Sequence, residues 1–266
     1  MKFSERAPAP GSVRTPSSWR SSPSGPIIYV GLAPIVVMIW SLLWPYWPSE
    51  EPGTKTYSIR VLSYDPLIIY IIGFLSLTER KFLASLSRDS ERRFERSKVF
   101  QDGVHAIDSF RTSSTAFLAT DNLIAERIIA RASEVQGYTD RSKHEGLQLT
   151  RYETGQQFRP HLDPLEGHEG EAMHRLTTIF AIVEATCVEC GTQFPNLRFN
   201  WTLEHPSWCN YVDCNEDKAL TIKAVPGNAV FWKSWDTFGR IDNRTLHAGL
   251  PPEKGTKIGL NIWTNG

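Results

Sequence analysis

The chain has 266 residues, with 29 basic and 29 acidic side chains and therefore no formal net charge. This balance argues against a protein that binds nucleic acid through a general basic surface, because phosphate binding requires an excess of Lys and Arg. A hydrophobic content of 41% excludes a wholly disordered chain. Four cysteines are too few for a disulfide-built scaffold of this length, and no internal repeat indicates a solenoid or a propeller.

The first part of the chain differs in composition from the rest. Residues 1–25 are rich in Ser, Pro and Arg and are predicted to form a disordered cytosolic tail. Residues 26–48 carry no charge, are mostly apolar and have aromatic side chains near both ends. A run of about 20 apolar residues is long enough to cross a bilayer, so this segment is predicted to be a transmembrane signal anchor.

Two other interpretations of the apolar segment are less favoured. A cleaved signal peptide would need small residues before its cleavage site, whereas Trp and Pro stand there. A buried core helix fits poorly beside a disordered tail. The basic residues before the segment predict a cytosolic N-terminus and a lumenal body, hence a single-pass protein of the endoplasmic reticulum membrane. Residues 49–65 are then expected to be a linker and residues 66–266 the folded domain.

Two further patterns agree with a lumenal body. Asn200 and Asn243 each begin an Asn-x-Thr sequon for N-glycosylation, although so short a pattern also occurs by chance. The four cysteines could form one or two disulfides in an oxidising lumen, remain as buried thiols, or bind zinc as a ribbon. These cysteines are Cys187, Cys190, Cys209 and Cys214.

The folded body begins with one predicted strand and two predicted helices. Residues 67–74 form a short apolar run that predicts a buried strand. Ser76 and Glu79 have the spacing of a capping box and predict the start of a helix. A second helix is predicted to open at Thr120 and Asp121 and to carry an apolar stripe. The stripe consists of Leu123, Ile124, Ile128 and Ile129.

After about residue 145 the pattern changes to short strands and turns. Apolar runs and alternations predict strands near 147–152, 178–185, 220–224, 229–232 and 257–263. Helices followed by many strands indicate an α+β body with a β-sandwich or barrel core.

The last predicted strand has two distinct faces. One face carries only aliphatic side chains, at 258, 260 and 262, and is expected to pack in the core. The other face carries Lys257, Gly259, Asn261 and Trp263. This second face could be solvated, or it could line a cavity in which the lysine binds an anion.

A candidate metal site begins at His161 and Asp163. On an extended chain, positions i and i+2 point to the same side, so an imidazole and a carboxylate could reach one ion. A second histidine from a distant segment would complete a two-histidine, one-carboxylate set, which suits Fe(II) with open coordination positions. By itself the pair is weak evidence, because an exposed or hydrogen-bonded histidine is the commoner case.

Further motifs occur in one order between about residue 66 and the C-terminus. They are Phe74-Leu-Ser76, the Arg111-Thr-Ser stretch, Glu145-x-Leu147-Gln148, Tyr152-x-x-Gly155-Gln156, His161-x-Asp163, Arg175-x-x-Thr178, Gly191-Thr-x-Phe194-Pro195, Pro226-x-Gly-Asn228-Ala, Leu246-His-Ala-Gly249 and Lys257–Trp263. With these motifs the sequence resembles the 2-oxoglutarate/Fe(II) dioxygenases, and among them the catalytic domain of the prolyl 4-hydroxylases.

The resemblance implies roles for three sets of residues. The implied iron ligands are His161, Asp163 and His247. The implied 2-oxoglutarate contacts are Lys257, Tyr152 and Thr178. The implied positions at the substrate groove are Glu145, Gln148, Arg175 and Trp263.

The resemblance also implies a fold and an activity. The expected fold is α+β, with a double-stranded β-helix (jelly-roll) core backed by N-terminal helices and preceded by the transmembrane helix. The expected activity is hydroxylation of an unactivated C–H bond, with peptidyl proline as the leading substrate and release of succinate and CO2. It would use Fe(II), 2-oxoglutarate and O2, with ascorbate as reductant. The alternatives are oxidation of a small-molecule metabolite and, more remotely, a binding module without turnover. A zinc hydrolase is disfavoured because no general base is well placed.

The sequence departs from the family pattern at two places. Glu189 and Cys190 stand where the family usually has a Gly-Gly pair, which puts the local turn in doubt. Residues 196–219 form a longer segment with Trp and Cys residues, and substrate choice often depends on such loops.

Overall fold

The computed structural model describes residues 57–88, 94–101, 104–106, 109–119, 121–164, 174–215 and 219–266. These residues belong to one compact unit, Gly53–Gly266. The predicted tail and transmembrane segment lie outside the described residues. Within the described part of the chain, no helix is both long enough and apolar enough to span a membrane.

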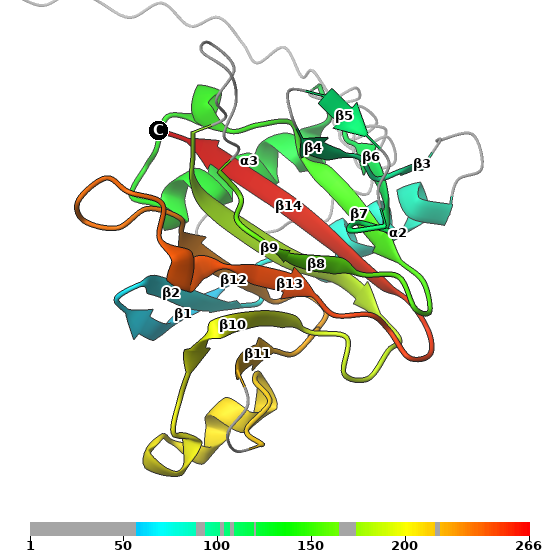
Figure 1. Cartoon of the computed structure of the whole chain (residues 1–266). Coiled ribbons are helices and arrows are strands. Elements are labelled where there is room, and N and C mark those ends of the chain that lie inside the picture. The colour runs from blue at the N-terminus through cyan, green and yellow to red at the C-terminus, as the bar shows by residue number, and fades with distance from the viewer. Residues whose placement is uncertain are drawn as a thin grey trace, which may run out of the picture. The chain divides into compact units, whose positions relative to one another are not determined.

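The larger of two facing sheets has eight strands and positions most of the core. Its central strand, β14 (Lys257–Asn265), pairs antiparallel with β9 (Arg175–Ala185) on one side and with β7 (Gln148–Tyr152) on the other (Figure 1). The remaining strands extend the sheet in the order β1-β2-β12 beyond β9 and β6-β3 beyond β7. Their bounds are β1 Ser58–Tyr64, β2 Leu67–Ile72, β12 Ala229–Lys233, β6 Ser114–Phe117 and β3 Glu95–Arg96.

The smaller sheet has four strands in the order β11-β10-β13-β8, and a separate two-stranded hairpin lies between β3 and β6 in the sequence. Two facing antiparallel sheets of this kind agree with the predicted jelly-roll core. The strands are β11 Ala219–Ile222, β10 Thr192–Arg198, β13 His247–Gly249 and β8 Phe158–His161, with the hairpin formed by β4 Val99–Gln101 and β5 Val104–Ala106.

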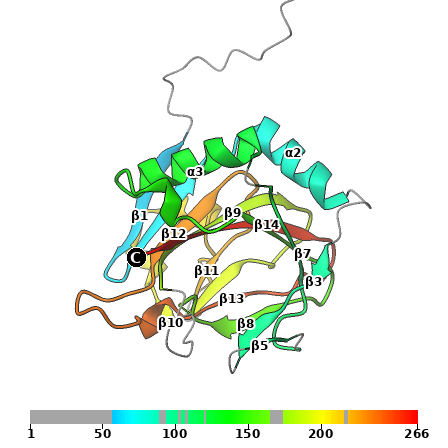
Figure 2. The same ribbon diagram turned by 90° about the horizontal axis from the view of Figure 1, so that it is seen from above.

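Helices α2 (Leu77–Arg88) and α3 (Leu123–Val135) cover the outer face of the large sheet, opposite the side on which the small sheet lies (Figure 2). The predicted capping box at the start of α2 is confirmed. The Ser76 amide donates to a Glu79 carboxylate oxygen at 2.8 Å, and the Glu79 amide donates to the Ser76 hydroxyl at 3.2 Å. Among the described residues, short 3-10 helices occur at η1 Arg141–Lys143, η2 Trp201–Leu203, η3 Pro206–Asn210 and η4 Asn243–Thr245.

The same Glu79 carboxylate also joins the two helices to each other. Arg131 of α3 makes a bidentate contact with it, at 2.9 and 3.0 Å. Arg131 further donates to the Phe74 carbonyl at 2.8 Å. One buried carboxylate therefore caps α2 and fixes its position against α3.

Two predictions at the ends of elements were wrong in detail. The second helix opens one residue later than predicted, because the Asn122 side chain caps it by accepting from the Ile124 and Ala125 amides. Leu123 belongs to the predicted apolar stripe but is 63% exposed, since the buried face of α3 runs through Ala125, Ile128 and Ala132.

The predicted linker 49–65 was also too long. Ser58–Tyr64 form strand β1, which pairs antiparallel with β2 at the edge of the large sheet. The strand was missed because most of its side chains are exposed, so it lacks the apolar run that marks β2. The folded domain therefore begins before the predicted boundary at residue 66.

The two faces of β14 separate the interior into two hydrophobic clusters. Ile258, Leu260 and Ile262 pack with the helices and the outer face of the large sheet, as the sequence predicted. The opposite face of the sheet looks toward the small sheet, where Phe194 and Trp232 are among the side chains of the second cluster. The polar face of β14 is thus enclosed between the sheets rather than solvated.

Candidate functional site

Strands β8 and β13 bring two histidines of distant sequence together. In their antiparallel register His161 lies directly opposite His247. Asp163 follows β8 by two residues, and its Oδ2 atom lies 3.8 Å from His247 Nε2. Each of the three residues offers a ligand atom within 4.8 Å of the others, so together they could hold a metal ion.

Backbone carbonyls fix the orientation of both imidazole rings. His161 Nδ1 lies 2.8 Å from the Arg159 carbonyl, and His247 Nδ1 lies 3.0 Å from the Thr245 carbonyl. Because a carbonyl oxygen can only accept, each Nδ1 carries the proton and donates it. The Nε2 lone pairs therefore remain free, which is the usual tautomer of a histidine prepared for a metal.

The Asp163 carboxylate is held by donors from the large sheet. Thr178 Oγ1 in β9 donates to Oδ2 at 2.6 Å, and Trp263 Nε1 in β14 lies 3.3 Å from Oδ1. Burial by itself would raise the pKa of Asp163, but the neighbouring His247, His161 and Arg175 outweigh it and lower that pKa. The carboxyl is therefore an anion at neutral pH.

Aromatic side chains line the two histidines. The Phe158 ring stacks on the His161 ring with their centroids 3.4 Å apart, and Trp232 lies 4.5 Å from His247. Loss of hydration is the main cause that lowers the pKa of His161 well below its usual value. His161 is thus kept neutral, as a metal ligand must be.

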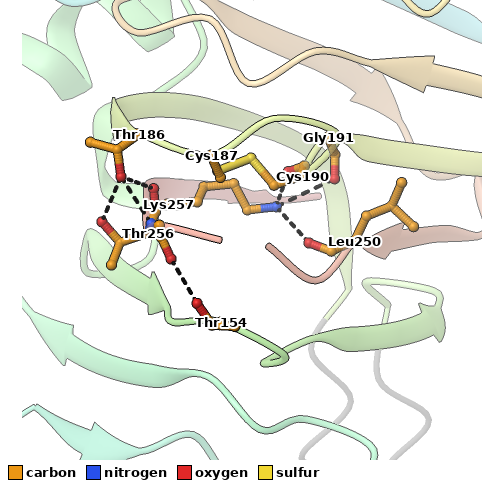
Figure 3. Close-up of a disulfide and its surroundings, with 9 residues drawn as sticks. Thr154, Thr186, Cys187, Cys190, Gly191, Leu250, Thr256 and Lys257 are labelled. Atoms are coloured by element: carbon orange, nitrogen blue, oxygen red, sulfur yellow. Dashed lines mark hydrogen bonds between the residues drawn. A yellow bond between two sulfur atoms is a disulfide. The ribbon is translucent and has the colours of Figure 1, made fainter. Parts of the chain in front are cut away.

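Lys257 is the most deeply buried charged side chain near this cluster, with no exposed surface. Its Nζ donates to three backbone carbonyls, those of Cys190 at 2.5 Å, Gly191 at 3.3 Å and Leu250 at 3.3 Å (Figure 3). Burial lowers the pKa of Lys257 to about 7. Among the described residues no carboxylate contacts this amine, so the position is suited to an anion supplied from outside the chain.

Tyr152 lies beside Lys257 at the end of β7. The two residues are cross-strand partners, and Lys257 Nζ lies 4.6 Å from the centroid of the Tyr152 ring. A Cβ atom at Gly249 of β13 would come within 3.0 Å of the Tyr152 hydroxyl. Gly249 lies two residues after His247, and its lack of a side chain leaves the space that the Tyr152 hydroxyl occupies.

The residues predicted at the substrate groove form one connected group. Arg175 makes a bidentate ion pair with Glu145, at 2.7 and 2.8 Å. The guanidinium also lies over the Trp263 ring, 3.7 Å from its centroid. Because Trp263 contacts Asp163 through its Nε1, this group is linked directly to the candidate metal site.

Gln148, also predicted at the groove, leads to a residue that sequence reasoning missed. Its side-chain oxygen accepts from Arg111 at 2.9 Å and from Asn261 at 3.3 Å. Arg111 is buried and lies 4.5 Å from the Phe158 ring centroid. The Arg-Thr-Ser stretch that carries Arg111 was a usable signal, whereas the stacking of Phe158 on His161 had none in the sequence.

The remaining candidate positions are the two sequons and the four cysteines. Asn200 and Asn243 are both exposed, and glycosylation at either remains a prediction. The four cysteines pair as two short-range disulfides, Cys187–Cys190 and Cys209–Cys214. The second closes part of the 196–219 segment around η3.

The donor set fits Fe(II). Two imidazoles, each with its Nδ1 atom against a backbone carbonyl, and one carboxylate form the set typical of non-haem iron sites that keep open positions. Hydrogen-bonding partners orient all three residues, which is the second requirement for such a site. The buried Lys257 then fits the carboxylate of an anionic cosubstrate.

Comparisons with known proteins agree with this chemistry. The sequence model of the 2OG-Fe(II) oxygenase superfamily matches residues 147–265. The chain is 29% identical over 219 residues to a probable prolyl 4-hydroxylase 8 of Arabidopsis thaliana, covering 80% of this chain and 73% of that protein. It is 25% identical to the human prolyl 4-hydroxylase subunit alpha-1, covering 74% of this chain but 34% of that protein.

A solved structure shares the fold. The viral collagen prolyl hydroxylase of Paramecium Bursaria Chlorella virus-1, in its 2OG complex, superposes with a TM-score of 0.50 at 22% identity. The match covers 79% of this chain and 95% of the viral chain. At this level of identity the likeness supports the jelly-roll architecture.

Proposed function

We propose that the protein is a 2-oxoglutarate/Fe(II) oxygenase of the prolyl 4-hydroxylase kind and that it hydroxylates proline residues of a peptide or protein. The observation that carries the proposal is the pairing of a His161–Asp163–His247 cluster with the buried, carboxylate-free Lys257. A metal-binding triad alone would suit many reactions. A buried cation beside it adds a requirement for an anionic cosubstrate.

In this proposal His161 and His247 bind Fe(II) through Nε2, and Asp163 binds it through its carboxylate. Iron held by these residues, with 2-oxoglutarate and O2, would supply the chemistry of a hydroxylation that releases succinate and CO2. The chain's own contribution is to hold the three ligands in place. Thr178 and Trp263 do this for Asp163 by donating to its two oxygens.

Lys257 and Tyr152 are proposed to bind 2-oxoglutarate. The ammonium of Lys257 would donate to the carboxylate far from the metal, and the Tyr152 hydroxyl would reach the same molecule past Gly249. Thr178 was expected to join them. Its proton is already donated to Asp163, so we assign Thr178 to orienting the metal ligand.

Glu145, Arg175 and Trp263 are proposed to position the substrate chain. Their ion pair and stacking hold a rigid surface next to Asp163. Gln148 extends this surface toward Arg111. A peptide substrate is favoured over a free metabolite because the relatives named as prolyl 4-hydroxylases align over most of this chain and most of their own length.

The test is a succinate-release assay with proline-rich peptides, followed by mass spectrometry of the peptide. We expect one added oxygen on proline and none in a matched peptide in which alanine replaces each proline. The His247→Ala variant is the control for contaminating activity. Turnover confined to free small molecules would refute a peptidyl substrate while leaving the oxygenase assignment in place.

We also propose, from the sequence alone, that residues 26–48 anchor the protein in the endoplasmic reticulum membrane with the catalytic domain in the lumen, and that ascorbate serves as reductant. Protection of the domain from protease in intact microsomes tests the topology. Digestion without detergent would contradict it. Loss of sustained turnover when ascorbate is omitted tests the reductant.

A further inference from the structure

The carbonyl groups that hold Lys257 belong to an unusual turn. Two of the three oxygens that accept from its Nζ are those of Cys190 and Gly191, and Cys190 is bonded to Cys187 (Figure 3). The third is the Leu250 carbonyl, from the segment that follows β13. The shortest of the three contacts, at 2.5 Å, is the one to Cys190.

Both ends of this turn are anchored independently of the disulfide. On the upstream side, the Thr186 amide donates to the Thr256 carbonyl at 3.0 Å, and the Thr256 amide donates to the Thr186 hydroxyl at 3.0 Å. On the downstream side, the Leu250 amide donates to the Gly191 carbonyl at 3.0 Å. Gly191 packs so closely on β11 that an added Cβ would come within 2.3 Å of the Ile222 carbonyl.

Between these anchors the backbone adopts a conformation that its sequence disfavours. Glu189 has a φ of 60°, in the left-handed region that a side chain makes costly. The Cys187–Cys190 bond spans this residue and closes the turn. The disulfide therefore closes the turn that carries the Cys190 carbonyl, whereas the Gly191 carbonyl accepts from the Leu250 amide.

We propose that the Cys187–Cys190 disulfide positions Lys257 for the carboxylate of 2-oxoglutarate, so that breaking this one bond weakens cosubstrate binding. The inference rests on the proposed function, since it concerns the same lysine. Without the bond, Glu189 can leave the left-handed region and the Cys190 carbonyl moves with it. The Lys257 amine then loses its closest acceptor and part of its preorganisation for the ligand.

The turn is open to a reductant. Val188 is 79% exposed and Cys187 is partly exposed, whereas Cys190 is buried. A dithiol would attack the Cys187 sulfur, and Cys190 would leave as a thiolate that takes up a proton. The second thiol of the reagent then displaces Cys187 as a thiol, and the reagent closes to its own disulfide. Two electrons pass from the reagent to the protein.

The test measures the Kd of 2-oxoglutarate by calorimetry, on the full chain loaded with Fe(II) and kept free of O2. Cys187→Ser/Cys190→Ser removes the proposed positioning bond. Cys209→Ser/Cys214→Ser removes the other disulfide and is the matched control. We expect the first variant to lose binding free energy equal to about one hydrogen bond, which raises its Kd about three- to tenfold. The Kd of the second variant should not change.

Two further measurements distinguish the loss of the disulfide from a folding defect of the serine variant. In Cys209→Ser/Cys214→Ser, treatment with dithiothreitol and its removal by gel filtration should raise the Kd by the same factor, with thiol titration as proof of reduction. Adding Glu189→Gly to Cys187→Ser/Cys190→Ser should restore the Kd, because glycine adopts the left-handed turn without the bond.

The possible failures are distinguishable. A wild-type protein that binds no 2-oxoglutarate would overturn the proposed function and this inference with it. A wild-type protein that binds 2-oxoglutarate with the same Kd before and after reduction of Cys187–Cys190 would overturn this inference alone. Equal losses in both serine double variants would also overturn it, since the effect would not belong to the turn around Lys257.

Discussion

The proposed contact between Lys257 and 2-oxoglutarate predicts that cosubstrate binding is sensitive to pH. In the free protein its pKa is lowered to about 7 because burial disfavours the ammonium form. A carboxylate ligand needs that ammonium form, so raising the pH through 7 removes the binding-competent state and weakens the affinity. The bound carboxylate returns the pKa of Lys257 toward the ordinary value of lysine, so binding takes up a proton. The affinity for 2-oxoglutarate therefore falls as the pH rises.

The expected size follows from the fraction of charged lysine. With a pKa of about 7, the ammonium form falls from about 75% at about pH 6.5 to about 3% at about pH 8.5, so the Kd should rise about 25-fold across that range. Lys257→Met should remove the dependence and bind about 10- to 150-fold more weakly at the acidic end, the worth of one charge-assisted hydrogen bond. Lys257→Arg should bind with a flat pH profile, because its guanidinium stays charged.

The assay is calorimetric titration of the Fe(II)-loaded protein with 2-oxoglutarate in the absence of O2. Repeating it near pH 8 in two buffers of different ionisation enthalpy counts the protons taken up, and about 0.9 proton per ligand is expected from the same pKa. A wild-type Kd that stays constant between about pH 6.5 and pH 8.5, with no proton uptake, would refute the role of Lys257 as the anion-binding cation.

Three other outcomes test the remaining parts of the structure. Alanine at any one of the three proposed metal ligands should abolish succinate release while the circular dichroism spectrum stays native; near-normal release by one variant would remove that residue from the ligand set. Glu145→Gln should raise the KM for peptide but not for 2-oxoglutarate, because it loosens Arg175 and leaves the anion site intact; an unchanged peptide KM would place the pair outside the substrate surface. Glu79→Ala should lower the free energy of unfolding by about 3–5 kcal/mol, since it leaves Arg131 buried and unpaired, and chemical denaturation would show whether the loss is that large.

The sequence predicted the elements that have local signals. The capping box fixed the start of α2 because its two hydrogen bonds join residues three apart. The two-faced pattern of β14 predicted which side chains face the helices. Strand β1 escaped notice because an exposed edge strand has no apolar run, and its pairing with β2 is visible only in the folded chain.

The site was predictable in its residues and not in its contacts. His161-x-Asp163 and a distant histidine gave the donor set, but only the register of β8 against β13 places His161 opposite His247. Two of the three carbonyls around Lys257, those of Cys190 and Gly191, come from a segment far from it in the sequence. A backbone acceptor cannot be recognised from the identity of the residue that carries it. The role of Thr178 as a donor to Asp163 likewise depended on where two separate segments meet.

The hydrogen bonds and ion pair of Glu79 also determine how the two helices open locally in the native state. One carboxylate serves the first turn of α2 and the guanidinium of Arg131 in α3, and that guanidinium returns to the Phe74 carbonyl just before α2. If either helix detaches from the sheet, the ion pair between Glu79 of α2 and Arg131 of α3 breaks, and the charge on the other helix loses its partner. In native-state hydrogen exchange the amides of both helices should therefore open as one cooperative unit, with a common free energy of opening.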